Sequence, residues 1–308
     1  MTRLRPFVPS VLLAAVPVTA CLFAAAAGAA ETGMAWLAVQ PDARSAVMGN
    51  AVVSNVTDAS AVIWNPAGLA GMVGGEGLVS HAESFADIRR EFAALARNYG
   101  AYSAGAHFEG VWTDNLDGYD EAGNSTGTFG YYGLSAGLAG AVRVGDNLRF
   151  GAGAKYLREQ IDVESATGWG IDLGAQWSSA DLPLTAGVSV LNLGPDVSFV
   201  DEEFSIPAVV QGGVSYTLPV RSLSGGVLVS TEMRKVSDED ASLLVGVEYQ
   251  HLGLVSLGFG YRSSMDEQDV SLGFGFRRDR FRVHYAFVPL NDSLLGDEHR
   301  IGLGVAVW

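Results

Sequence analysis

The feature that most restricts the fold of this chain is an alternation of apolar with small or polar residues, repeated in segment after segment. In 148–156 the even positions are Leu, Phe, Ala, Ala and Tyr, whereas the odd positions are Arg, Gly, Gly and Lys. The same alternation fills 169–177, 255–262 and 270–277. A period of two residues is typical of a strand with one apolar face. The chain is therefore predicted to be all-β.

A soluble β-sandwich shows the same period, so the period alone cannot distinguish it from a barrel. The kinds of residue on each face can. Trp169 and Trp177 bracket an aliphatic run on one face, as expected for the aromatic girdles of a barrel whose apolar band is about 25 Å tall. The opposite faces carry isolated charges, which a dry sandwich core could not accommodate. We interpret these charged positions as lumen-facing: Arg149, Lys155, Asp172, Glu248, Arg262, Arg277, Arg282 and His284.

The number and spacing of the segments favour a transmembrane antiparallel β-barrel of about 14 strands. Short turns at 145–147, 252–253 and 278–280 alternate with longer polar loops, as barrels require. Because 85–90 shows no clean turn, a count of twelve stays open. The predicted strands are 77–85, 88–98, 101–113, 127–143, 148–162, 167–178, 184–192, 206–218, 222–234, 241–251, 254–263, 269–278, 281–289 and 298–308, and the longer loops are 115–126, 194–205, 236–240, 264–268 and 290–298.

The end of the chain and its charge fit this interpretation. The last strand runs to an aromatic residue, Trp308, as in many outer-membrane barrels, although Trp308 is one step out of register with the apolar face. After the N-terminal segment, no stretch reaches the roughly 18–20 apolar residues of a membrane helix. The formal net charge of −15 has the wrong sign for a nucleic-acid partner.

The N-terminus reads as a cleaved export signal, residues 1–30. Arg3 and Arg5 form a basic start, 7–27 is apolar, and 27–30 offers small-residue cleavage sites. Two alternatives stay open: a permanent membrane anchor, and lipidation of Cys21, the only cysteine, in a lipoprotein-like box at 18–21. The mature chain is otherwise free of cysteine, which excludes disulfides and Cys-based metal sites.

Residues 31–75 form a segment, here called the hatch, that differs from the strands after it. Asp58 or Thr57 is placed to cap a helix over 59–64, and Asn65 with Pro66 is placed to begin a second one. Capping residues and apolar side chains at helical spacing predict two short helices ahead of a barrel over 76–308. The segment is too short to bury a core of its own, so Trp64 and Leu69 are expected to pack on the inner barrel wall.

The hatch also carries a motif, 43–51 followed by 57–70, that resembles the N-terminal signature of the PorV/PorQ proteins, a branch of the FadL-type outer-membrane barrels. The run 64–70 matches without a break, whereas Asn50 stands where the family usually has Gly. The resemblance implies a barrel of fourteen strands. Its motif positions here are Arg44, Gly49, Asp58, Trp64, Asn65, Pro66, Gly68 and Leu69.

The resemblance implies two functions of different kinds. PorV-like barrels are non-enzymatic components of type IX secretion in the Gram-negative outer membrane, which hold secreted cargo through their outer loops. FadL-type relatives instead pass hydrophobic small molecules through a hatch-gated lumen. Because the inward faces are glycine and charge, the sequence tilts toward the first. The expected partners are outer-membrane lipid, the barrel-assembly machinery, and either secretion subunits with cargo C-terminal domains or a hydrophobic small molecule. A purely structural barrel is a third alternative.

Other chemistry finds little support, so we expect neither an enzyme nor a cofactor. The Gly-x-Gly pairs lie inside strands, and the five histidines share no metal-ligand spacing. No nucleophile elbow or His-Glu-x-x-His is present. The acidic stretch 115–124 lacks calcium-loop spacing and is expected to be a solvated loop. The lumen-facing charges are expected to pair with one another, the alternative being a polar pathway for a solute.

Overall fold

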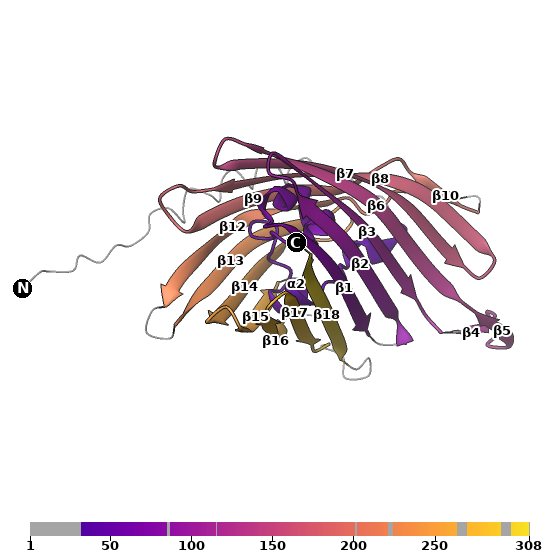
Figure 1. The fold of residues 1–308 in the computed structure, drawn as a ribbon. Helices are drawn as coiled ribbons and strands as arrows, with labels where there is room; N and C mark the ends of the chain where they lie inside the picture. The colour runs from indigo at the N-terminus through magenta and orange to yellow at the C-terminus, as the bar shows by residue number, and fades with distance from the viewer. Residues whose placement is uncertain are drawn as a thin grey trace, which may run out of the picture.

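Fourteen antiparallel strands close into one barrel (Figure 1). The computed structural model describes residues 32–84, 87–114, 116–200, 202–220, 224–263, 270–290 and 297–307. The barrel confirms the predicted fold class, and it decides for fourteen strands against twelve. The predicted signal with Cys21, the uncertain turn at Phe85, the loop 264–268 and the terminal Trp308 lie wholly or partly outside the described residues.

Each barrel strand pairs with its neighbours along the chain, and β1 closes the ring against β18, with Gly75 opposite Val307. The strands are β1 (Gly75–Glu83), β2 (Arg89–Asn98), β3 (Tyr102–Trp112), β6 (Tyr131–Val144), β7 (Leu148–Ile161), β8 (Glu164–Ser178), β9 (Leu184–Leu193), β12 (Val209–Val220), β13 (Gly225–Val236), β14 (Ser242–His251), β15 (Val255–Arg262), β16 (Val270–Arg278), β17 (Phe281–Val288) and β18 (Glu298–Val307).

The barrel has two different ends. One, here called the turn end, carries the tight connections such as 145–147 and 252–254, and β1 starts there. The other, the loop end, carries the longest connections, between β3 and β6 and between β9 and β12, together with the two-residue turn 162–163 between β7 and β8. Among the described residues, no helix is long and apolar enough to cross a membrane.

Two of the loop-end connections contain hairpins where the sequence predicted plain loops. Leu116–Tyr119 (β4) pairs with Ser125–Phe129 (β5), and Val197–Phe199 (β10) pairs with Glu202–Phe204 (β11). The prediction of plain loops over 115–126 and 194–205 was therefore wrong. Ladders of three to five residues are too short to show a period of two, so their hydrogen bonds could not be foreseen from the pattern.

The alternation along the strands divides the wall into two faces. On β8, Trp169, Leu173 and Trp177 point outward and are exposed, whereas Asp172 and Gln176 point inward and are buried. Successive side chains of a strand lie on opposite faces, so one set contacts the barrel's surroundings and the other contacts whatever fills the lumen.

The hatch fills the lumen (Figure 1). It contains four short helices: η1 (Ala35–Ala38), α2 (Ala43–Val47), α3 (Ala61–Trp64) and η2 (Pro66–Gly71). Its largest core side chain, Trp64, lies in one cluster with Leu69 and with Leu78 and Phe92 of the wall. A segment of about forty residues cannot exclude water from its own apolar side chains, so it borrows the inner wall of the barrel.

The helices begin somewhat differently from the prediction. The helix expected over 59–64 begins at Ala61, and Ser60 before it makes no side-chain cap. Asp58 accepts a hydrogen bond from the nitrogen of Ser60 instead (3.0 Å). Asn65 does cap the next turn, accepting from the nitrogen of Ala67 (3.1 Å), although Pro66 there begins a 3₁₀ helix.

Candidate functional site: the plugged lumen

The hatch runs through the lumen from one end of the barrel to the other. At the loop end, Thr32 bridges Ser205 next to β11, and the nitrogen of Gly33 donates to the carbonyl of Ser205 (3.1 Å). At the turn end, the nitrogen of Asn98 donates to the carbonyl of Gly74, and β1 follows (2.8 Å). The candidate site is thus the whole lumen, with a single segment threaded along it.

Three arginines of the wall hold the first part of this segment, residues 32–40, here called the strap. Arg90 of β2 donates to the carbonyls of Trp36 (3.0 Å) and Val39 (3.1 Å). Arg234 of β13 donates to the carbonyl of Ala38, and Arg300 of β18 donates to that of Gln40. Trp36, Ala38 and Gln40 are buried, and a buried carbonyl without a donor is costly. The arginines therefore bind the strap through its main chain.

The strap also inserts apolar side chains into the loop end of the lumen. Met34, Trp36 and Leu37 are buried in one cluster that the wall and the β10–β11 connection complete. The remaining buried members are Val111, Leu157, Ala166, Val197 and Ile206. The loop end of the lumen is therefore an apolar chamber, occupied here by the chain's own residues.

Deeper in the lumen, inward-facing glycines let the hatch main chain touch the wall. A Cβ on Gly151 of β7 would lie 2.3 Å from the carbonyl carbon of Pro66, and one on Gly260 of β15 would lie 2.0 Å from the nitrogen of Gly49. Neither distance is possible for a real side chain. Gly151 and Gly260 are thus contact points at which a side chain would push the hatch away.

Buried polar side chains of the wall bind the hatch main chain at the same depth. Glu232 of β13 accepts from the nitrogens of Val53 (3.1 Å) and Ser54 (2.9 Å). Gln176 of β8 donates to the carbonyls of Val53 (3.0 Å) and Val56 (3.1 Å). Most main-chain nitrogens of 48–56 bond to carbonyls of the hatch itself, but those of Val53 and Ser54 do not, so the barrel supplies their partners.

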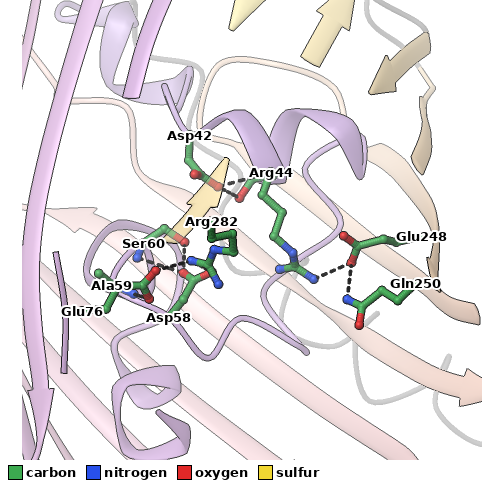
Figure 2. A network of polar contacts seen from close by, with 10 residues as sticks. Asp42, Arg44, Asp58, Ala59, Ser60, Glu76, Glu248, Gln250 and Arg282 are labelled. Carbon is green, nitrogen blue, oxygen red and sulfur yellow. Dashed lines mark hydrogen bonds and ion pairs between the residues drawn. The ribbon is translucent and has the colours of Figure 1, made fainter. Parts of the chain in front are cut away.

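Ion pairs form a third set of contacts between hatch and wall (Figure 2). Arg44 of α2 pairs with Glu248 of β14 (Nη2–Oε2 2.9 Å). Asp58 of the hatch pairs with Arg282 of β17 (Oδ2–Nη2 3.1 Å), which also contacts Glu76 of β1. The motif residues Arg44 and Asp58 thus each find a wall partner of opposite charge.

Two carboxylates of the hatch sit in contrasting surroundings (Figure 2). Burial, together with the nearby Asp58, raises the pKa of Asp42, whose carboxylate accepts from the nitrogen of Ser45 and caps α2 (2.9 Å). Burial acts in the same direction on Asp58, but Arg282 and Arg44 outweigh it and hold the pKa of Asp58 below its usual value. The surroundings of Asp58 therefore favour its charged form, whereas those of Asp42 disfavour it.

A buried polar cluster marks a break in the wall between β8 and β9. The pairing register shifts between Ile171 and Leu173, and Asn192 opposite adopts a left-handed conformation (φ 61°). Asp172 accepts from the nitrogen of Asn192 (2.8 Å) and pairs with Lys155 (2.9 Å). The bulge and the ion pair stabilise each other, because the carboxylate satisfies an amide that the shifted ladder leaves free.

The eight predicted lumen-facing residues all lie on inward positions, yet they do not form one site. Lys155 and Asp172 pair with each other, whereas Glu248 and Arg282 pair with the hatch. Arg149 donates to Gln176 (3.3 Å), and Arg262 is buried. A cavity of about 30 Å³, enough for one or two water molecules, lies at the turn end beside Arg277 and His284.

Several residues that hold the hatch were missed by sequence analysis. Glu232 and Arg234 stand on inward positions of β13, alternating with the outward Thr231 and Met233. Arg90, Gln211 and Arg300 also point inward. Sequence analysis could have found these residues, because they occupy the alternate positions of their strands that face inward. Of the motif positions, Gly49 and Gly68 lie against main-chain atoms, of Gly260 and Val56 respectively.

Comparison with known proteins identifies neighbours by structure alone. No family model matches the chain, and no curated protein matches its sequence. The toluene transporter TodX of Pseudomonas putida is similar in fold, with a TM-score of 0.63 at 14% identity over 85% of this chain and 96% of that chain. A FadL homologue of Pseudomonas aeruginosa has a TM-score of 0.57 at 12% identity, covering 85% of this chain and 98% of the homologue. The chain therefore has the fold of FadL-type outer-membrane barrels.

Proposed function

We propose that this chain is an outer-membrane channel that takes up hydrophobic small molecules, with the hatch as its plug. The proposal rests on the apolar chamber at the loop end, in which Met34 and Trp36 take the place that a hydrophobic solute would occupy. The neighbours in fold include TodX, described as a toluene transporter and as a monoaromatic hydrocarbon channel. The loop end would face the cell exterior and the turn end the periplasm.

The contacts of the hatch suggest which part would move. The strap is held by apolar contacts and by arginine side chains that donate to its main-chain carbonyls. Neither kind of contact depends on a specific polar side chain of the strap. The stretch 48–71 is held by glycine contacts, buried hydrogen bonds and the ion pair of Asp58 with Arg282. A solute that displaced the strap would enter the chamber first, and passage would then require the deeper part to shift as well.

The experiment is a reversible lock between hatch and wall. A Cβ on Gly258 of β15 would lie 3.6 Å from the Cβ of Val47 in α2, within the range that disulfides span. The double variant Val47→Cys/Gly258→Cys, with Cys21→Ser to remove the native thiol, should form this disulfide on oxidation. Cells expressing the chain should take up labelled toluene faster than cells with an empty vector. Oxidation of the lock should reduce uptake to the vector level, and a reductant should restore it.

The two single-cysteine variants are the controls, because they carry the same substitutions without the bridge. Equal uptake by oxidised and reduced locks would contradict a moving hatch, and uptake at vector level by the unsubstituted chain would contradict transport itself. The secretion role expected from the PorV/PorQ resemblance finds no support in the neighbours named above and stays a prediction. It would act through the loop-end hairpins, and the lock would leave it unchanged.

A further inference from the structure

The outward face of β1 and β2 differs from that of β8. On β8, every outward residue from Trp169 to Trp177 is apolar, a distance of about 26 Å along the strand. On β2, the outward Leu95 and Ala93 lie between two charged residues, Arg97 and Glu91, so the apolar run is much shorter. Charge on the lipid-facing side of a barrel is destabilising. This face is poorly suited to lipid contact.

The polar side chains on this face are ordered in complementary pairs. His81 of β1 stands opposite Glu91 of β2, and their side chains are bonded (Nδ1–Oε1 2.6 Å) although each is about two-fifths exposed. One row further toward the loop end, Glu83 stands opposite Arg89, which also pairs with Asp114 (3.2 Å). Each polar group of this face thus has its complement on the other strand.

Toward the turn end, large side chains of one strand stand opposite small residues of the other. Gly77 of β1 stands opposite Leu95, and Val79 of β1 stands opposite Ala93. Leu95 and Val79 are exposed (61% and 52%), so each large side chain projects beside a small one. This part of the outer wall has a hollow of about 530 Å³. The outward-facing residues that line it include Gly77, Val79, Ala93, Leu95, Phe108 and Leu303.

These two patterns make the face complementary to itself. A twofold axis along the membrane normal, passing between β1 and β2, would place β1 of one copy against β2 of the other at nearly the same depth. His81 would then meet Glu91 of the second copy, and Leu95 would enter the hollow over Gly77. Self-complementarity of this kind is what a twofold interface requires. We infer that β1 and β2 form a homodimer interface within the membrane.

A second copy accounts for the face better than lipid does. An acyl chain could fill the hollow, but it would leave the row of His81 and Glu91 against hydrocarbon. A second copy fills the hollow with Leu95 and also offers His81 and Glu91 an additional hydrogen-bond partner each. The inference does not depend on the proposed transport, because it concerns the outside of the wall.

Cysteine cross-linking in native membranes tests the interface. Ala93→Cys on β2 should form a disulfide-linked dimer under mild oxidation, because residue 93 lies close to the proposed axis. Ala175→Cys on the outward face of β8 is the matched control and should stay monomeric, as should the unsubstituted chain with its single Cys21. No dimer at 93, a cross-link to a different protein, or equal cross-linking at 93 and 175 would each overturn the inference.

Charge exchange separates this interface from chance contact. His81→Glu in the Ala93→Cys background should reduce the dimer yield at least fivefold, because four carboxylates would then meet at the axis. The double change His81→Glu/Glu91→His restores the opposite signs and should restore the yield. Resistance of the folded barrel to detergent unfolding shows that each variant folds. If the folded His81→Glu and His81→Glu/Glu91→His variants give the same dimer yield, the twofold arrangement is wrong.

Discussion

The carboxylate of Glu232, on the inner face of β13, accepts hydrogen bonds from both the nitrogen (2.9 Å) and the hydroxyl (2.6 Å) of Ser54 in the hatch. It also accepts from the nitrogen of Val53 and from Gln211. One buried acid thus satisfies two consecutive main-chain amides of an irregular segment. Without it, those amides would be buried without partners, so Glu232 couples the folding of the hatch to the wall.

We therefore expect Glu232→Ala to release the hatch around 53–54. Each unsatisfied buried amide costs about 1–3 kcal/mol, so loss of the acceptor for two amides should lower the free energy holding the hatch in place by roughly 2–6 kcal/mol. Hydrogen exchange of the Val53 and Ser54 amides should rise accordingly while the strand amides stay protected. Glu164→Ala, which removes an exposed acid of β8, is the control. Unchanged exchange at 53–54 would contradict this role for Glu232.

Asn65 both caps a turn and donates hydrogen bonds, so we expect that a replacement that keeps only the cap will destabilise the hatch. Its side-chain oxygen caps the turn after it, a contribution of about 1 kcal/mol, while its amide donates to the carbonyls of Val53 (2.9 Å) and Ala175 (3.2 Å). Asn65→Ala should loosen the hatch. Asn65→Asp keeps the cap but turns a carboxylate oxygen toward those carbonyls, and should loosen it more. Protease cleavage within 43–70 should rank the unsubstituted chain slowest, then Ala, then Asp; the reverse order of the two variants would refute the donor role.

The two hatch carboxylates should respond to pH with opposite signs. Asp58 has a lowered pKa in the folded chain, so its pairing with Arg282 stabilises the hatch above the pKa of an unfolded aspartate, about 3.9, and this stability is lost as pH falls through the folded value. Asp42 has a raised pKa, so its contribution is most favourable below about 3.9 and weakens as pH rises through the folded value.

The corresponding variants should therefore diverge at neutral pH. Asp58→Asn should increase hydrogen exchange of the hatch at pH 7, because Arg282 loses a charged partner while Glu76 stays beside it. Asp42→Asn keeps an oxygen for the cap of α2 and removes a buried charge near Asp58, so it should leave exchange unchanged or reduce it. The difference for Asp42→Asn should disappear below about pH 3.9, whereas that for Asp58→Asn should persist there and shrink only as pH falls through the lowered pKa of Asp58. A loss of protection in Asp42→Asn equal to that in Asp58→Asn would show that burial of charge is not what separates them.

A charge placed in the middle of the outward face of β8 should be costly. Leu173 is exposed on that face between Trp169 and Trp177, and Leu173→Arg should destabilise the folded barrel by about 2–4 kcal/mol in lipid. Leu182, similarly exposed but in the turn between β8 and β9, is the matched site, and Leu182→Arg should cost little. Denaturant titration of barrels folded into vesicles measures both. Equal costs would contradict a membrane belt centred on Leu173.

The strands could be predicted because their signal is local. The period of two in 148–156 fixes which residues share a face, and turns such as 145–147 fix where the strand ends. All fourteen barrel strands overlap the predicted ones. The hairpins β4–β5 and β10–β11 escaped because their ladders are shorter than one clear repeat.

The site was less predictable because its contacts join distant residues. The motif located the hatch, and parity placed Glu248 and Arg282 inside, but nothing in the sequence pairs Arg44 with a residue 204 positions away. Those pairings depend on how the barrel closes and at what depth the hatch lies. The same holds for the strap, whose carbonyls bind Arg90, Arg234 and Arg300 from three separate strands.

The final prediction concerns the apolar chamber at the loop end. Trp36 is buried there against Gly133 of β6, where a Cβ would lie 2.5 Å from its ring. Trp36→Ala should weaken the strap by about 3–5 kcal/mol and leave an apolar cavity. Such cavities stay dry and bind small aromatic molecules, so toluene should restore protection of the strap amides in the variant.

The unsubstituted chain has no such vacancy and should respond to toluene far less. Trp112→Ala, which removes a tryptophan from the outward face of β3, tests whether loss of any indole is sufficient. Hydrogen exchange of residues 34–40, with and without toluene, is the measurement. If toluene protected all three proteins equally, or failed to protect Trp36→Ala, the chamber around Trp36 would not be a binding site for hydrophobic molecules.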